Sequence, residues 1–126
     1  MTKNIFVAFG HHNTKNSFNS SVRDTFIDEA KKCGHNIDLI NLHEEKQLNF
    51  FDGKPPNDQV LDYRKRLEKS DVMFLISPCY NLRASAILEN WIDLVLAPKW
   101  FFAFKKVYGN WGYPVAGAMK NKLAIM

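Results

Sequence analysis

Apolar and polar positions divide the chain into four short apolar runs separated by stretches with helical spacing. The runs cover residues 3–9, 36–42, 71–77 and 121–126. Short runs of apolar residues bounded by turn signals are typical of β-strands. The third run, "DVMFLIS", is almost continuously apolar, as expected of a strand covered on both faces,. We therefore predict four strands, with the third in the interior of a sheet.

Each interval between two runs contains a segment with helical periodicity. The first predicted helix spans residues 18–33, with Ser17 or Asn19 as N-cap and Gly34 as its stop,. Pro98 ends the third helix,. The expected buried stripes of the three helices are Phe18, Val22, Phe26, Ile27 and Ala30, then Val60, Tyr63 and Leu67, and then Ile87, Leu88, Trp91, Ile92 and Val95,.

Two longer segments are predicted to be loops. Residues 43–57 are polar and contain Gly53, Pro55 and Pro56, and a loop of this length is often functional,. Residues 98–113 are rich in aromatic side chains. Those aromatic residues either form a surface for a partner or substrate, or cover the third helix, and the sequence supports both interpretations.

The regular alternation of strand and helix predicts an α/β fold with a parallel sheet and helices on both faces. At 126 residues the chain has the length of a single domain,. Sheets of this kind bind ligands beyond the carboxyl ends of their strands, where the connections leave in opposite directions. The loops at residues 10–19 and 78–84 are therefore the candidate ligand-binding segments.

Composition narrows the classes of function. With 46% hydrophobic residues and no apolar run near the length of a membrane helix, we expect no membrane insertion and no secretory signal, hence a cytoplasmic protein,. The net charge of +4 is dispersed among acidic residues, which favours solvated helix faces over a nucleic-acid surface,. Cys33 and Cys79 lie in no metal-binding or disulfide pattern and are expected to be free thiols,.

The loop at residues 10–19 is polar and precedes a helix. Unpaired backbone N–H groups and the helix dipole favour an anion such as phosphate there. The alternative is that Ser17 only caps the helix and that the rest of the loop is solvated. His11 and His12 lack further ligands of the usual kinds, so no metal site is predicted,.

The loop after the third run contains Pro78, whose ring fixes the turn,. Tyr80, Asn81 and Leu82 can offer backbone amides and a flat surface to a planar aromatic ligand,. The alternative is that Tyr80 and Leu82 pack the third helix against the sheet. Cys79 has no base that could activate it and is interpreted as part of an apolar wall,.

Both loops resemble those of a known family. "GHHNTKNSFN" (10–19) is similar to "AHPxxxSFN", and "SPCYNLRASAILENWID" (77–93) is similar to "FPLYWFxxPAILKGWID", of the flavodoxin-like NAD(P)H:quinone oxidoreductases. The likeness runs in order along the chain and includes "GAMKNKLAIM" near the end. It implies a flavodoxin-like three-layer α/β/α sandwich with strand order 2-1-3-4-5. In this chain of residues 1–126 we expect that domain to be truncated after its fourth strand, as a shortened form or a fragment.

The resemblance also implies an activity. The family transfers hydride from NADH or NADPH to bound FAD or FMN in a ping-pong reaction, and the flavin then reduces a quinone or related acceptor. The residues that would hold the flavin phosphate are His11, Ser17, Phe18 and Asn19, and those that would line its ring are Pro78, Cys79, Tyr80, Asn81 and Leu82. A homodimer is implied as well. No catalytic acid or base is assigned, and a non-catalytic, regulatory module of the same fold is the alternative.

Overall fold

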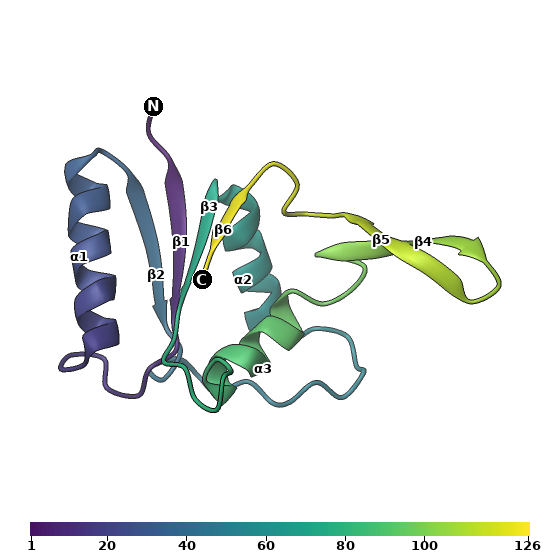
Figure 1. Cartoon of the computed structure of the whole chain (residues 1–126), viewed down its shortest axis with the longest axis horizontal. Coiled ribbons are helices and arrows are strands. Elements are labelled where there is room, and N and C mark those ends of the chain that lie inside the picture. The colour runs from purple at the N-terminus through teal and green to yellow at the C-terminus, as the bar shows by residue number, and fades with distance from the viewer.

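The computed structural model describes residues 1–126, apart from the side chain at position 116. Helices and strands alternate along most of the chain, as predicted (Figure 1). The elements are β1 (Asn4–Phe9), α1 (Phe18–Lys32), β2 (Asn36–Asn41), α2 (Asp58–Lys69), β3 (Val72–Ile76), α3 (Ala86–Val95), β4 (Phe102–Tyr108), β5 (Trp111–Ala116) and β6 (Leu123–Ile125).

Four strands form one parallel sheet in the order β2-β1-β3-β6. Helix α1 covers one face of this sheet, whereas α2 and α3 cover the other (Figure 1). The prediction of a flavodoxin-like α/β fold is thereby confirmed, with the last strand of the chain beside β3. The order reverses between β1 and β3, so the loops that follow these two strands emerge side by side at one edge,.

Successive side chains of β1 are all apolar and pack alternately into the clusters on the two faces of the sheet. Ile5, Val7 and Phe9 belong to the cluster on the α1 side, and Phe6 and Ala8 belong to the cluster on the α2 and α3 side. Successive side chains of a strand point to opposite faces, so a strand with helices on both sides must be apolar throughout. The second cluster also contains the predicted helix positions Val60, Tyr63, Leu67, Leu88, Trp91 and Val95.

Helix α1 differs from its predicted stripe. Ile27 and Ala30 are buried as expected, but Phe18 is 82% exposed and Val22 is 36% exposed, so the prediction that these two residues pack in the core was wrong. Both lie in the N-terminal part of the helix, toward the carboxyl edge of the sheet. Arg23 lies along the helix between the exposed Val22 and the buried Ile27, and it is itself buried, at 7% exposure.

The aromatic segment predicted to be a loop at 98–113 is instead mostly an antiparallel hairpin of β4 and β5. The hairpin projects away from the sheet (Figure 1). Tyr108 and Trp111 are 83% and 80% exposed, so the interpretation of this segment as a cover over α3 was wrong for the hairpin. The base of the hairpin packs inward: Trp100 lies against the α2 and α3 cluster and donates to Glu68 Oε1 at 2.9 Å.

Among the described helices, none has both the length and the apolar composition needed to span a membrane.

Candidate functional site

The two candidate loops meet where β1 and β3 end. The amide of Gly10 donates to the carbonyl of Ile76 at 2.8 Å, and the Ser85 hydroxyl donates to the carbonyl of Gly10 at 2.6 Å. A Cβ at position 10 would lie 2.9 Å from Ser85 Oγ and 3.0 Å from Leu88 Cβ. Gly10 is therefore needed because the start of α3 approaches the end of β1 too closely for a side chain.

Ser85 was not predicted to have this role. It lies directly before α3 and is buried, and its amide donates to Ser77 Oγ at 2.8 Å. The Ser77 and Ser85 hydroxyl oxygens are 3.1 Å apart. Two serines eight positions apart give no recognisable signal in a sequence, because only the turn between them brings them together.

The first loop is held in shape by its own hydrogen bonds. Asn13 Oδ1 accepts from the amides of Lys15 and Asn16 at 3.2 and 2.8 Å, and the amide of Asn13 donates to His11 Nδ1 at 3.0 Å. Ser17 Oγ donates to the carbonyl of Asn13 at 3.0 Å. The loop is thus a closed, polar turn that leads into α1.

Ser17 is the N-cap of α1. Its Oγ accepts from the amide of Ser20 at 3.0 Å, and Ser20 Oγ accepts from the amide of Ser17 in return. Of the two predicted N-cap candidates, Ser17 is the N-cap, whereas Asn19 lies inside the helix. By helix geometry the amides of Phe18 and Asn19 have no acceptor within the helix. An anion at this loop would therefore bind mainly to the backbone.

Arg23 holds the first loop in place by hydrogen bonds. The sequence did not indicate this role. Its guanidinium donates to the carbonyl of Thr14 at 2.7 Å and to Asn41 Oδ1 at 3.1 Å, and it lies 4.5 Å from the centre of the Phe9 ring. It also pairs with the exposed carboxylate of Asp24. The only signal in the sequence was a basic residue next to the expected apolar stripe.

The second loop contains a strained turn. Tyr80 and Arg83 exchange backbone hydrogen bonds of 2.8 and 3.0 Å, while Asn81 and Leu82 have φ values of 51° and 62°. Positive φ at both central residues is the geometry of a type I′ turn, which suits asparagine but costs leucine about 1 kcal/mol. The amide of Tyr80 is occupied within this turn by the carbonyl of Arg83.

The side chains of this turn face solvent. Leu82 is 96% exposed and Tyr80 is 48% exposed, so the alternative in which they pack α3 against the sheet was wrong. Backbone strain of this kind is often found at ligand-binding sites, where the surrounding structure maintains it.

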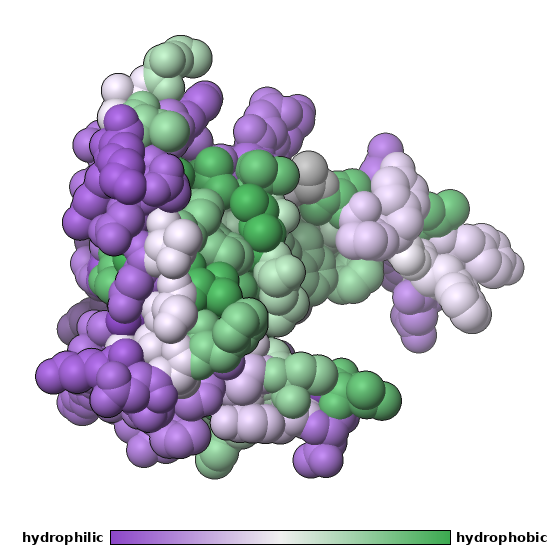
Figure 2. All heavy atoms as spheres, turned by 60° about the vertical axis from the view of Figure 1, so that its left-hand side comes forward, coloured by the Kyte–Doolittle hydropathy of each residue, from purple (hydrophilic) through white to green (hydrophobic). Residues whose placement is uncertain are grey.

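A cleft of about 460 Å³ lies beside the turn, on the α1 side of β3. Its apolar lining continues over the exposed sheet surface next to α1 (Figure 2). Three of the predicted ring-lining residues, Pro78, Cys79 and Leu82, border it, and Val22 of α1 reaches it from the other loop's helix. Its other lining residues are Phe74, Leu75, Ile76, Ser77, Arg83, Ala84 and Met126.

The structure thus brings the two loops together, but only some of the predicted binding residues line the cleft. Tyr80 and Asn81 do not line the cleft and lie on the turn above it. His11 and Ser17 belong to the hydrogen-bonded first loop, and Phe18 is exposed at the start of α1. Both cysteines are free thiols, as predicted, and both are exposed.

Three histidines gather beside the first loop. The rings of His11 and His12 are stacked with centroids 4.4 Å apart, and His43 meets His12 edge-on at 6.4 Å. Partial burial and repulsion from the other two lower the pKa of His43 below 6.5. Within the described part of the chain, no three His, Cys, Asp or Glu side chains are grouped so as to hold a metal ion.

A parallel sheet covered on both faces, with a loop-built cleft at its switch point, defines a protein of the flavodoxin-like α/β class. The chain belongs to the flavodoxin-like fold family, whose model matches residues 3–126.

Two relatives match most of this chain but only part of their own length. It is 24% identical to mouse ribosyldihydronicotinamide dehydrogenase [quinone], over 98% of this chain and 62% of that protein. It is 27% identical to FMN-dependent NADH:quinone oxidoreductase 1 of Mesoplasma florum, over 80% of this chain and 54% of that protein. The chain therefore spans less than two thirds of the length of either relative.

A solved structure has the same fold. The crystal structure of an FMN-dependent NADH-azoreductase from Bacillus anthracis, in complex with FMN, superposes with a TM-score of 0.70. The match covers 97% of this chain and 66% of that one at 14% identity.

Proposed function

We propose that the chain is the flavin-binding part of an NAD(P)H:quinone oxidoreductase, with FMN or FAD as its cofactor and a quinone or related compound as acceptor. The observation that carries the proposal is the meeting of the two loops, fastened through Gly10 to Ile76 and Ser85 beside an apolar cleft. The relatives' names support flavin-dependent quinone reduction, and that of the Mesoplasma florum protein supports FMN and NADH.

The residues at this edge fit a flavin in two respects. The start of α1 offers backbone amides at Phe18 and Asn19, which suit a phosphate. The cleft of about 460 Å³ and the exposed side chain of Leu82 offer apolar surface that suits a flat ring,.

The roles of the residues follow from this arrangement. A bound flavin supplies the hydride chemistry, accepting two electrons from a nicotinamide and passing them to the acceptor. The first loop would fix the phosphate through the backbone of Phe18 and Asn19, with His11 close by and Ser17 holding the helix start. The second loop would orient and shield the ring with Pro78, Cys79, Tyr80, Asn81 and Leu82.

The hairpin is the proposed surface for a second copy of the chain. Phe104, Tyr108 and Trp111 are 64%, 83% and 80% exposed, and exposed apolar surface that is gathered in one place often marks a contact with another protein,. A homodimer that covers these side chains would also bring them near a quinone-like acceptor. We further propose a cytoplasmic location, because two exposed free thiols fit a reducing compartment,.

The test is to add FMN or FAD to the purified chain and to follow quenching of flavin fluorescence, then to add NADH or NADPH without oxygen. We expect saturable binding and bleaching of the flavin absorbance, followed by reoxidation with a quinone. Leu82→Ala should weaken flavin binding. The control is Leu61→Ala, which alters an exposed leucine on α2, away from the cleft, and should leave flavin binding unchanged. A chain that binds neither flavin would overturn the proposal and favour a non-catalytic module.

A further inference from the structure

The ring of His11 meets the backbone of Asn13 in a contact that has two possible hydrogen-bonding arrangements. His11 Nδ1 accepts from the amide of Asn13 at 3.0 Å and also lies 3.2 Å from the carbonyl oxygen of the same residue. A neutral imidazole with no proton on Nδ1 accepts from the amide, whereas an imidazolium carries a proton on both nitrogens and can only donate. One ring nitrogen therefore faces both a donor and an acceptor, and its own proton decides which of the two it binds.

Asn13 is the residue that joins most of the first loop together. Its Oδ1 accepts from the amides of Lys15 and Asn16, and its Nδ2 donates to the carbonyl of Asn16 at 2.9 Å. Its own carbonyl accepts from the hydroxyl of Ser17, the N-cap of α1, at 3.0 Å. That hydroxyl has a second acceptor in Ser20 Oγ at 3.2 Å. A new donor at the carbonyl of Asn13 therefore competes with a bond that is made at the start of α1.

The cationic and titratable groups around His11 come from three segments. His12 stacks on it from the same loop, and His43, from the segment after β2, meets His12 edge-on. Arg23 of α1 lies 4.5 Å from the ring of Phe9, which in turn lies 6.3 Å from the ring of His11. Partial burial, and then the charges of His12 and His11, lower the pKa of His43. A proton on one ring thus disfavours a proton on the next, and the rings take up protons in steps.

The acidic side chains close to these rings are bonded to other groups. In the described part of the chain no ion pair involves a histidine. Glu44, which follows His43, accepts from Asn41 Nδ2 at 3.0 Å, and Glu45 accepts from the Tyr63 hydroxyl at 3.1 Å. The other charged side chains of the two segments next to the rings are Lys15 and Lys46. The partner of a newly protonated His11 is therefore a backbone carbonyl and not a carboxylate.

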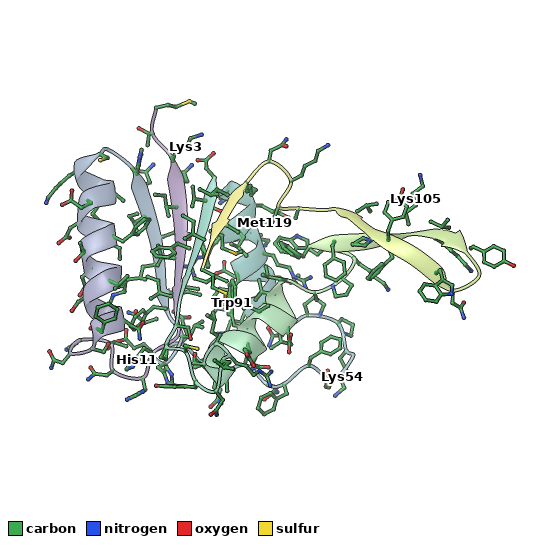
Figure 3. The ribbon with its side chains drawn as sticks, viewed as in Figure 1. Lys3, His11, Lys54, Trp91, Lys105 and Met119 are labelled. Atoms are coloured by element: carbon green, nitrogen blue, oxygen red, sulfur yellow. The ribbon has the colours of Figure 1, made fainter. Side chains whose placement is uncertain are left out.

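We propose that the first loop is a pH-dependent switch in which the protonation of His11 selects the hydrogen bond made to Asn13. In the neutral state the Asn13 amide donates to Nδ1, and Nε2 carries the ring proton. When the ring takes up a second proton, Nδ1–H donates to the carbonyl of Asn13 and the amide is released to solvent. His11 lies at the carboxyl end of β1, where the two candidate loops emerge (Figure 3). The switch is a property of the loop itself and does not depend on the proposed function.

NMR of the full chain labelled with ¹⁵N, without flavin, tests the switch between about pH 8 and pH 5, where histidines titrate. The imidazole nitrogens and the backbone amides are followed together. We expect His11 Nδ1 to carry no proton at the upper end of this range. The His11 ring and the Asn13 amide should then change with one common midpoint. Protection of the Asn13 amide from hydrogen exchange should fall roughly tenfold across that midpoint, the value of one hydrogen bond.

Two substitutions separate the switch from a general effect of pH. His11→Asn keeps an acceptor oxygen near the position of Nδ1 but cannot titrate, so the Asn13 amide should stay protected throughout. His35→Asn is the matched control, because His35 Nδ1 accepts from the amide of Lys3 at 3.3 Å, at the other end of β1. In that variant the response at Asn13 should be unchanged.

The wild-type titration alone can refute the switch, whether or not the variants fold. The proposal is overturned if His11 Nδ1 already carries a proton at about pH 8. It is also overturned if the Asn13 amide does not respond, or if it follows the ring of His12 or His43 in place of that of His11. A response at Asn13 that persists in folded His11→Asn would equally overturn it.

Discussion

Replacing Arg23 with methionine tests whether this buried guanidinium holds the first loop. Methionine keeps most of the apolar contact with Phe9 but leaves the carbonyl of Thr14 and Asn41 Oδ1 without their donor. Bonds from a charged donor contribute about 1.5–3 kcal/mol each, and water can replace part of this at a half-buried loop. Asp24 is 56% exposed and keeps its hydration when its partner is lost. We expect the free energy of unfolding to fall by about 2–4 kcal/mol.

Urea denaturation measures this change, with Lys32→Met as the matched control on the same helix. Lys32 pairs with Glu29 at an exposed position, so its loss should cost less than about 0.5 kcal/mol,. Arg23→Met should also weaken FMN binding, because the loop that precedes α1 loses its anchor. If the two substitutions destabilised the chain equally, Arg23 would not be the anchor described above.

Three further changes have defined outcomes. Gly10→Ala should destabilise the chain by about 1–3 kcal/mol in urea denaturation because its Cβ would meet Ser85 Oγ at 2.9 Å, and adding Ser85→Ala should cost less than the sum of the two changes,. Leu82→Gly relieves the positive φ of 62°, but the greater freedom of glycine in the unfolded chain offsets most of that gain, so stability should change by less than about 0.5 kcal/mol while FMN affinity falls in a fluorescence titration,. The pKa of His43 lies below 6.5, so its contribution to stability is present above pH 6.5 and is lost as the pH falls through that lowered pKa,. Histidine-ring NMR should show the pKa of His43 rising when His12→Gln removes a repelling charge, and an unchanged pKa would contradict the coupling.

The sequence predicted the sheet and the places of its helices well. Strands covered on both faces must be apolar throughout, and the strands of residues 3–9 and 71–77 carry that pattern without ambiguity,. Ser17 was a correct N-cap because capping depends on a few neighbouring residues,. The hairpin of β4 and β5 was missed because its aromatic residues were interpreted as surface or cover, and the two-residue turn at Gly109 and Asn110 was overlooked,.

What the sequence determined by itself is therefore the local structure and the two loops that follow β1 and β3. Tertiary structure alone decided how those loops meet: Gly10 touches Ser85, 75 positions away, and Arg23 reaches the carbonyl of Thr14 across the start of its own helix. It also brought the ring of His43, from the segment after β2, beside that of His12 in the first loop. Periodicity reports which face of an element is buried, whereas a hydrogen-bond partner is fixed by the packing of distant segments, which no local pattern encodes.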